Sequence, residues 1–244
     1  DAMERPRNTV DLTLFVACYN EEERIVPTLD TLISALTETP LSWEIIIIDD
    51  ASRDKSVVRI RDYMQAHPQY SIDLKINVQN KGLAQNFVDG AFLGTGTYYR
   101  LVCGDDVESK DTLTKVFSHI GKADIITSYH AECQGRSAFR RGLSRLFTTL
   151  VNLISGYRLR YYNGLAVYHR YHVQRWHSNT YGFGFQADLL TRLLDEGYSF
   201  IEVPVVGGER QGGSSNALTL KNFLSVSHTL ASLAIRRLGK IMFR

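Results

Sequence analysis

The sequence contains few cysteines, and they form neither a metal site nor a disulfide framework. Cys18, Cys103 and Cys133 are widely spaced, odd in number and free of any C-x-x-C pair. Small secreted domains carry even sets of closely spaced cysteines, and structural zinc sites need Cys and His at short spacings. We therefore expect a reducing, cytoplasmic environment and no zinc site.

Two further absences exclude other classes of protein. No apolar run approaches the roughly 18 residues that a membrane-spanning helix needs. No G-x-G-x-x-G or P-loop follows the first predicted strand, where residues 17–23 read ACYNEEE. This argues against a dinucleotide oxidoreductase and against a P-loop phosphotransferase. An aromatic ring and acids at this place can instead hold a base and a ribose.

Acidic residues are missing from two long segments, although the whole chain has a formal charge of only +2. Residues 133–187 contain eight arginines and residues 211–244 contain five basic residues, in both cases without Asp or Glu. Such segments favour an anionic partner, such as a phospholipid surface, a lipid phosphate or nucleic acid. A solvated basic face is the alternative.

Short hydrophobic runs alternate with amphipathic segments in the first half of the chain. This alternation predicts an α/β fold with a mostly parallel, doubly wound sheet and helices on both faces. We expect Asn20 to cap a helix over about 22–36, and Ser52 to cap the helix after the second strand. The predicted strands are Leu12–Cys18, Glu44–Asp49, Ile72–Val78, Tyr98–Val102 and Asp124–Ser128.

The second half has a different character. It predicts an amphipathic helix over 139–155 flanked by arginines, a strand at Gly164–His169, a helix over Gly182–Glu196 and a strand at Phe200–Val205. From about residue 218 a basic amphipathic helix follows. Such a helix can lie in a membrane interface, pack on its own domain or pair with another chain.

Two aspartate pairs, Asp49-Asp50 and Asp105-Asp106, follow two of the hydrophobic runs. Ligands of open α/β sheets bind at the carboxyl ends of the strands. Four carboxylates delivered there repel one another unless a cation or a sugar-nucleotide shares the site. The alternative is that each pair caps a following helix, since Asp is a good N-cap. Two pairs on two strands favour a site.

Several short motifs, taken together, resemble those of a known enzyme family. In their order along residues 12–216, the chain resembles the inverting, nucleotide-sugar-dependent glycosyltransferases of family 2, which have the GT-A fold. It looks most like the dolichol-phosphate mannose synthase-like, or polyprenol-phosphate, branch. The matching segments are Ala17–Glu21, Ile48–Asp54, Asn80–Ala84, Gly104–Glu108, Tyr181–Asp188, Gly197–Val205 and Arg210–Ser215.

The resemblance implies a set of residues that bind the donor. In this family the ends of the first strands contact the nucleoside, and a Lys-Gly turn lies nearby. Asp105 is expected at the sugar or the ribose of the donor. The implied donor-binding residues are Ala17, Tyr19, Glu21, Asp49, Asp50, Lys81, Gly82 and Asp105.

The resemblance also implies Mg²⁺ or Mn²⁺ at the D-x-D motif of the family, where the cation bridges the donor diphosphate. A hard cation prefers oxygen ligands and stabilises the diphosphate as a leaving group. The chain departs from the usual motif, because Gly104 stands at its first position and Glu108 where Gln is usual. We therefore expect Asp106 and Glu108 to be the metal ligands, with Asp106 essential for catalysis. Tyr129-His130 stand where the branch often has an arginine.

On the acceptor side, the resemblance assigns phosphate or acceptor binding to Gln186, Arg210, Ser214 and Ser215. Asp188 lies where relatives place an acidic residue near the acceptor. With a hydroxyl acceptor it would be the general base. A phosphate monoester is largely ionised at neutral pH, and Asp188 would then orient the acceptor or the metal.

We therefore expect a glycosyltransferase that moves a sugar from a GDP- or UDP-sugar to a polyprenyl phosphate, on the cytoplasmic face of a membrane. Residues 1–216 would form the catalytic domain, with 133–180 facing the acceptor and the membrane, and 217–244 would form a basic amphipathic helix. The chain could also form homo-oligomers. The alternatives are the same fold acting on a saccharide or cell-wall polymer, with Asp188 as base, and an inactive nucleotide-sugar-binding scaffold. We expect no nucleic-acid partner.

Overall fold

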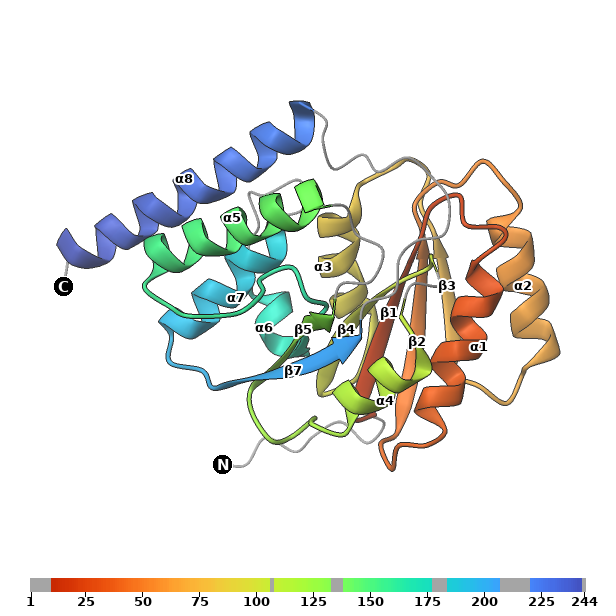
Figure 1. The fold of residues 1–244 in the computed structure, drawn as a ribbon. Coiled ribbons are helices and arrows are strands. Elements are labelled where there is room, and N and C mark those ends of the chain that lie inside the picture. Colours follow the sequence, from red (N-terminus) through yellow and green to blue (C-terminus); the bar gives the residue numbers. More distant parts are fainter. Residues whose placement is uncertain (1–9, 106–107, 133–137, 177–183, 207–219, 243–244) are drawn as a thin grey trace.

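A computed structural model describes residues 10–105, 108–132, 138–176, 184–206 and 220–242 of the chain. Their backbone forms one seven-stranded sheet in the order β3-β2-β1-β4-β6-β5-β7. The strands are β1 (Leu12–Cys18), β2 (Trp43–Asp49), β3 (Ile72–Ile76), β4 (Tyr98–Cys103), β5 (Ile125–Glu132), β6 (Val167–His169) and β7 (Phe200–Val206). All neighbours are parallel except β6, which is antiparallel to β4 and β5. The predicted α/β fold is confirmed (Figure 1).

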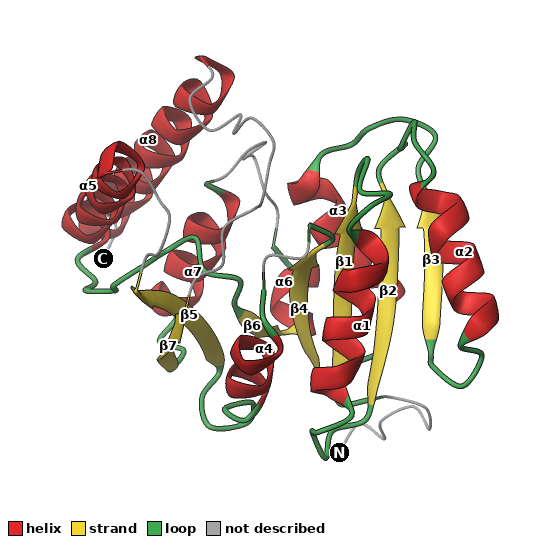
Figure 2. Cartoon of the chain, turned by 45° about the vertical axis from the view of Figure 1, so that its right-hand side comes forward, coloured by secondary structure: helices red, strands yellow, loops and turns green. Residues whose placement is uncertain are grey.

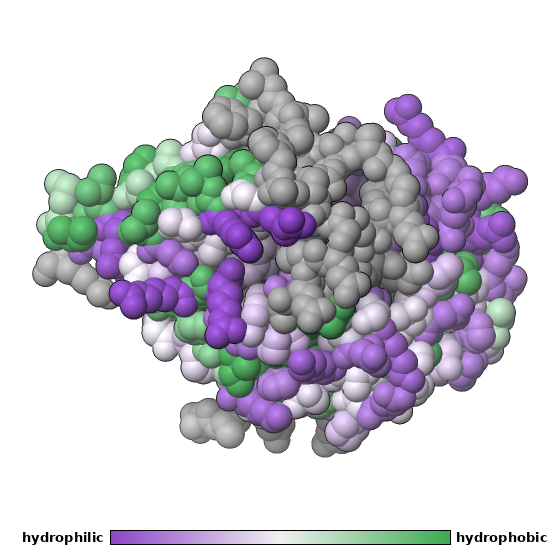
Figure 3. Space-filling view, viewed as in Figure 1, coloured by the Kyte–Doolittle hydropathy of each residue, from purple (hydrophilic) through white to green (hydrophobic). Residues whose placement is uncertain are grey.

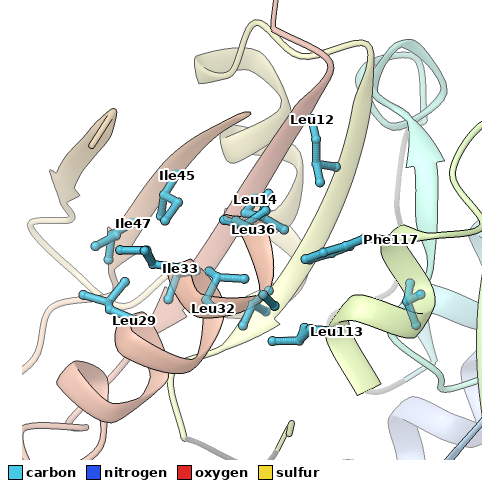
Figure 4. Close-up of a cluster of buried hydrophobic side chains, with 14 of the residues drawn as sticks. Leu12, Leu14, Leu29, Leu32, Ile33, Leu36, Ile45, Ile47, Leu113 and Phe117 are labelled. Atoms are coloured by element: carbon cyan, nitrogen blue, oxygen red, sulfur yellow. The ribbon is translucent and has the colours of Figure 1, made fainter. Parts of the chain in front are cut away.

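Helices cover both faces of the sheet (Figure 2). One face is covered by α1 (Ile25–Leu36), α2 (Ser56–Ala66) and α4 (Lys110–Phe117), and the other by α3 (Leu83–Leu93), α6 (Arg170–Gln174) and α7 (Phe185–Asp195). Each face has its own apolar core, because the side chains of a strand alternate between the two faces. In β2, for example, Ile45 and Ile47 pack with α1, whereas Ile46 and Ile48 pack with α3. Figure 4 shows the first of these cores.

The carboxyl ends of the three central strands meet at one edge of the sheet. Cys18 of β1 pairs in register with Asp49 of β2, and Ala17 pairs with Cys103 of β4. Asp49, at the end of β2, and Asp105, just after β4, therefore lie at the same edge of the sheet, with β1 between their strands. This is where ligands of such sheets bind.

The helices α5 (Ala138–Ser155) and α8 (Leu220–Met242) lie side by side beyond the β5–β7 end of the sheet (Figures 1 and 2). Val151 of α5 and Leu233 of α8 belong to the same apolar core as α7. Within the described ranges, no helix combines the length and the apolar character that crossing a bilayer requires. The division predicted at residue 216 falls in 207–219, outside the described residues.

Three local predictions are wrong. Helix α1 begins at Ile25 without a side-chain cap, and α2 begins at Ser56 without one. Asn20 and Ser52, the expected caps, instead bond across the two loops: the Asn20 amide donates to Ser52 Oγ at 2.9 Å, and Asn20 Oδ1 accepts from the Arg53 amide at 2.8 Å. The capping alternative for the aspartate pairs is also wrong, because Ser109 caps α4.

Candidate functional site

A cavity of about 460 Å³ opens at the carboxyl ends of β2 and β3. Its lining includes the apolar or aromatic side chains of Tyr19, Val57, Ile76 and Val78, and Tyr19 is half exposed. Its polar lining includes Asp49. A cavity lined by both apolar side chains and hydrogen-bonding groups suits a heterocyclic base with its ribose.

The first aspartate pair divides into one residue that faces this cavity and one that holds a loop. Asp49 is fully buried; its Oδ2 accepts a hydrogen bond from the Ser52 amide at 3.0 Å. Among the described residues, Asp49 Oδ1 has no hydrogen-bond partner. A buried acceptor in that state costs free energy unless a ligand donates to it. Because Asp49 also lines the cavity, this oxygen is a candidate acceptor for a ligand bound there.

Both oxygens of Asp50 are occupied by the loop that precedes α3. Asp50 Oδ1 accepts from the Lys81 amide and from Asn77 Nδ2, each at 2.8 Å, and Oδ2 accepts from the Gly82 amide at 2.9 Å. Burial of Asp50 acts to raise its pKa, but these bonds, together with one from Asn86, outweigh it and hold the pKa below the usual value. The role of Asp50 shown by these contacts is to shape the cavity's loop; its predicted contact with the donor stays a prediction.

The loops around the cavity have unusual backbone conformations. Ala51 has φ of 64° and Asn20 has φ of 55°, in the left-handed region that side chains other than glycine adopt at a cost. The hydrogen bonds of Asn20 with Ser52 and Arg53 hold both turns in place. Gly82, with φ of 82°, makes the turn into α3, and only glycine adopts this conformation without strain.

The remaining predicted donor residues lie along the same edge. Ala17 is at the end of β1, and the Glu21 amide is tied to Ser56 Oγ at 2.9 Å. Lys81 Nζ is paired with Asp89 at 2.9 Å, so its charge points toward α3. The structure brings these residues to one side of the sheet, and their roles as donor contacts stay predictions.

Gly104, which breaks the usual motif, is required by the packing of β4 on β1. Its amide donates to the Ala17 carbonyl at 2.9 Å, and a Cβ atom at this position would lie 2.8 Å from that carbonyl oxygen. No side chain fits there without moving the backbone of β1. An acid at position 104 is therefore excluded in this chain, and the carboxylates must come from later in the loop.

The second aspartate pair is only partly described. Asp105 is half-buried after β4, whereas Asp106 lies outside the described residues. Burial raises the pKa of the neighbouring Cys103 thiol, and the charges of Asp105, Glu108 and Glu21 raise it further. These three carboxylates are thus near enough to the end of β4 for their charges to act on Cys103.

Glu108, the other predicted metal ligand, is held by a buried arginine. Both its oxygens accept hydrogen bonds from Arg100, Oε1 from Nη2 at 2.5 Å and Oε2 from Nη1 at 3.1 Å. In the described ranges no group of three His, Cys, Asp or Glu side chains is arranged to hold a metal ion. The oxygen donors of this loop nevertheless match what Mg²⁺ and Mn²⁺ prefer.

The predicted acceptor-side acid, Asp188, forms a buried cluster in the first turn of α7. It is 3% exposed and accepts hydrogen bonds from Trp176 Nε1 at 3.0 Å, from Arg192 Nε at 2.9 Å and from Arg236 Nη1 at 2.7 Å. Four residues from three segments are thus joined through one carboxylate. A base must present a free lone pair to its substrate, which this arrangement does not favour.

Gln186 lies two residues before Asp188 and is 9% exposed. Among the described residues its Oε1 has no hydrogen-bond partner, which leaves a buried acceptor for a ligand. The other predicted phosphate-binding residues, Arg210, Ser214 and Ser215, lie outside the described part of the chain.

Three residues of this region were not identified from the sequence. Asn77 supports Asp50, Arg100 pairs with Glu108, and Arg236 pairs with Asp188. Arg100 had a signal, because it is a charge inside a hydrophobic strand. The partners of Asn77 and Arg236 depend on contacts 27 and 48 residues apart, which no local pattern reveals.

A family model described as glycosyl transferase family 2 matches residues 13–180. Among curated proteins, the chain is 26% identical over 223 residues to a dolichyl-phosphate beta-glucosyltransferase of Trichomonas vaginalis, covering 81% of this chain and 64% of that protein. The chain therefore spans less than two thirds of that relative's length.

Two solved structures share the fold. Glucosyl-3-phosphoglycerate synthase from Mycobacterium tuberculosis, in complex with Mg²⁺ and uridine diphosphate, superposes with a TM-score of 0.67 at 15% identity, covering 94% of this chain and 80% of that one. A mannosyltransferase from Pyrobaculum calidifontis, in complex with GDP-mannose and Mn²⁺, gives a TM-score of 0.60 at 17% identity, covering 98% and 66%.

Proposed function

The chain belongs to glycosyl transferase family 2 and is a glycosyltransferase with the GT-A fold. From this premise we propose that it transfers a sugar from a nucleotide-sugar to a polyprenyl phosphate at the surface of a membrane. The observation that carries the donor half is the buried Oδ1 of Asp49, which has no partner among the described residues and belongs to a residue that lines a partly apolar cavity. A base N–H or a ribose hydroxyl is the group that such an acceptor requires.

The proposed reaction is a single displacement with inversion. An oxygen of the acceptor phosphate attacks the anomeric carbon, the bond from that carbon to the donor diphosphate breaks, and the nucleoside diphosphate leaves with the bonding electrons. The donor residues hold the nucleotide and leave the anomeric carbon open on the far side. Orientation of the two reactants supplies a large part of such rate accelerations.

A divalent cation would be held in the loop after β4, with Asp106 as its proposed ligand and Asp105 beside it. When bound, Mg²⁺ or Mn²⁺ neutralises the diphosphate and makes it a better leaving group. Carboxylate oxygens fit this role, and aspartates gathered at one edge of a sheet repel one another unless a counter-charge is present. Glu108 is already paired with Arg100.

The acceptor half of the proposal depends on which face of α8 is turned outward. The face of α8 that packs inward carries Thr229, Leu233, Arg236 and Lys240, spaced three or four residues apart. Arg236 and Lys240 both pair with Asp195 of α7. Part of the basic stripe predicted for this helix is thus turned toward its own domain.

The opposite face of α8, together with α5, forms an exposed apolar surface, which we call the apolar ridge. Its side chains are 44–75% exposed, and Figure 3 shows a hydrophobic area over these two helices. Exposed apolar surfaces of this extent mark interaction sites. The ridge consists of Leu143, Leu146, Leu153, Leu224, Ile235, Leu238, Ile241 and Met242.

We propose that the apolar ridge docks on the membrane that contains the polyprenyl chain. Arg145 and Arg237 are exposed on the same two helices, and cations beside an apolar face suit an anionic lipid surface. A soluble saccharide acceptor would not explain why this apolar surface is exposed. It would also need a general base, for which the clustered Asp188 is poorly placed.

The proposal is tested with a panel of UDP- and GDP-sugars labelled in the sugar, in the presence of Mn²⁺. Each donor is offered to undecaprenyl or dolichyl phosphate in detergent, and in parallel to soluble saccharides. The expected result is label in the organic phase with one donor class. Label on a saccharide alone would favour the alternative acceptor, and binding of nucleotide without any transfer would favour a scaffold.

A further inference from the structure

A fully buried arginine lies in the middle of β4. Arg100 has no exposed surface, although its neighbours in the strand are apolar or aromatic. Its guanidinium makes a two-point ion pair with Glu108, and Nη1 also lies 3.3 Å from the Leu101 carbonyl. A buried charge needs such a partner, because water cannot solvate it. Glu108 is therefore needed by Arg100 whatever else it does.

The ion pair is one of two anchors that flank the second aspartate pair in the sequence. At one end of this segment, the Gly104 amide is bonded to the Ala17 carbonyl. At the other end, Glu108 is bound to Arg100, and Ser109 Oγ caps α4 by accepting from the Thr112 amide at 3.3 Å. Asp105 directly follows the first anchor, and three residues further along the chain Glu108 forms the second.

The pair also accounts for a departure of this chain from the family it resembles. Glu108 stands where Gln is usual, and its charge is matched by that of Arg100 inside the strand. The side chain of Glu108 is 19% exposed, and each of its oxygens already accepts one strong, charge-assisted bond. An adjacent guanidinium also reduces the negative charge that Glu108 offers to a cation.

We propose that Arg100 and Glu108 are a positioning pair, which anchors the chain after β4 for binding of the cation and the donor diphosphate, and that Glu108 acts through Arg100 rather than as a metal ligand. This inference rests on the proposed function in one respect: it assumes that a cation binds at this loop together with the nucleotide. It adds to that function two residues whose interaction can be measured with single and double variants.

The test is the affinity for Mn²⁺, measured by electron paramagnetic resonance with saturating UDP or GDP, whichever binds the wild-type protein. The variants are Glu108→Gln, Arg100→Met, Arg100→Lys and the double variant Arg100→Met with Glu108→Gln. Loss of an outer-shell partner typically weakens metal binding by about 10- to 100-fold. We expect each single variant to weaken Mn²⁺ binding to this degree, and the double variant to be no weaker than the weaker single variant.

A direct ligand role for Glu108 predicts the opposite sign for one variant. Arg100→Met would then free Glu108 and remove a positive charge, so Mn²⁺ would bind as well as in the wild type or more tightly. That result overturns the inference. Arg100→Lys keeps the charge but loses the two-point contact, and unchanged Mn²⁺ affinity in this variant would also overturn it.

Lys110→Met is the matched control. It removes a positive charge two residues from Glu108, but from an exposed pair with Glu38. Exposed pairs contribute little, so Mn²⁺ affinity should not change. If the wild-type protein itself binds no Mn²⁺ with either nucleotide, the proposed function fails. If it binds Mn²⁺ and the Arg100 variants match it, only the positioning pair fails.

Discussion

Arg236 of α8 donates a hydrogen bond from Nη1 to Asp188 Oδ1 of α7 at 2.7 Å, across 48 residues of sequence. The same guanidinium bonds to Thr191 Oγ1 at 2.5 Å and lies 3.4 Å from Asp195. The helix that carries half of the apolar ridge is therefore attached to the helix that carries the predicted acceptor-side acid. The packing of α8 on the domain and the environment of Asp188 therefore depend on the same contacts.

The first prediction concerns the strength of this attachment. Arg236→Met removes a donor from the buried Asp188 carboxylate and should lower the free energy of unfolding by about 1–3 kcal/mol. Urea unfolding followed by circular dichroism measures it. Arg192→Met is the control, because Arg192 pairs with the same carboxylate from a more exposed position, and it should cost less than about 1 kcal/mol. An equal cost for the two variants would contradict the account.

The second prediction separates the two residues of the first aspartate pair. Asp50→Asn must place an amide N–H₂ against backbone donors, so it should lower stability by about 1–3 kcal/mol. Asp49→Asn keeps an acceptor for the Ser52 amide and should change stability little. It should instead weaken nucleotide binding by about 10- to 100-fold, since a bond to a charged acceptor is lost. Calorimetric titration with UDP and GDP measures nucleotide binding, and unfolding curves measure stability. A loss of stability in Asp49→Asn together with a loss of binding alone in Asp50→Asn would refute the assignment.

The third prediction concerns pH. Burial, with the nearby charges of Arg175 and His169, lowers the pKa of His172 to about 4; Glu196 and Asp124 oppose this. The neutral ring accepts a bond from Arg175 Nε at Nδ1 and packs on Tyr198. Because an unfolded histidine titrates near 6.5, the unfolded state binds the extra proton first as the pH falls. The stabilisation that neutral His172 contributes is present in full above about pH 6.5 and is lost progressively as the pH falls to about 4.

The wild-type protein should therefore lose up to about 1.4 kcal/mol per pH unit from this group in that window. His172→Gln removes the titration, so the difference between the two unfolding free energies should shrink as the pH falls from 6.5 to 4. Parallel curves for the two proteins over this range would show that His172 does not titrate in this way.

The fourth prediction concerns the apolar ridge. The double variant Leu153→Asn with Ile235→Asn places two polar groups at ridge positions that are 75% and 70% exposed. Burial of one such side chain is worth about 1.5–3 kcal/mol, so binding to liposomes of phosphatidylglycerol and phosphatidylcholine should weaken at least about tenfold. Val58→Asn, at an exposed apolar position of α2, is the control. Liposome binding equal in the ridge variant and the control would rule out the ridge as the docking surface.

The strands could be predicted from the sequence because their signal is local. The run that ends at Asp49 is continuous and β-branched, and both aspartate pairs stand at the ends of such runs. This pattern was enough to predict at which edge of the sheet they lie. The caps expected at Asn20 and Ser52 failed because these side chains bond to each other's loops, 32 residues apart. A long-range partner competes with a local cap, and the sequence does not show which prevails.

The direction in which α8 faces could not be predicted for a related reason. The sequence separates its polar side from its apolar side, but it does not say which side meets the domain. Asp188 and Asp195 decide this, because their charges draw Arg236 and Lys240 inward and leave Leu238 and Ile241 exposed. Arg100 differs, because a charge inside a hydrophobic strand is visible in the sequence, but its partner Glu108 lies eight residues further along the chain.

The proposal that the acceptor is a lipid phosphate is tested most directly by comparing two lipids that differ in one group. Sugar-labelled donor and Mn²⁺ are incubated with undecaprenyl phosphate or with undecaprenol, and label in the organic phase is counted against nucleoside diphosphate released. The account predicts one labelled lipid per nucleoside diphosphate with the phosphate, and none with the alcohol. Equal transfer to both lipids, or transfer to the alcohol alone, would contradict it.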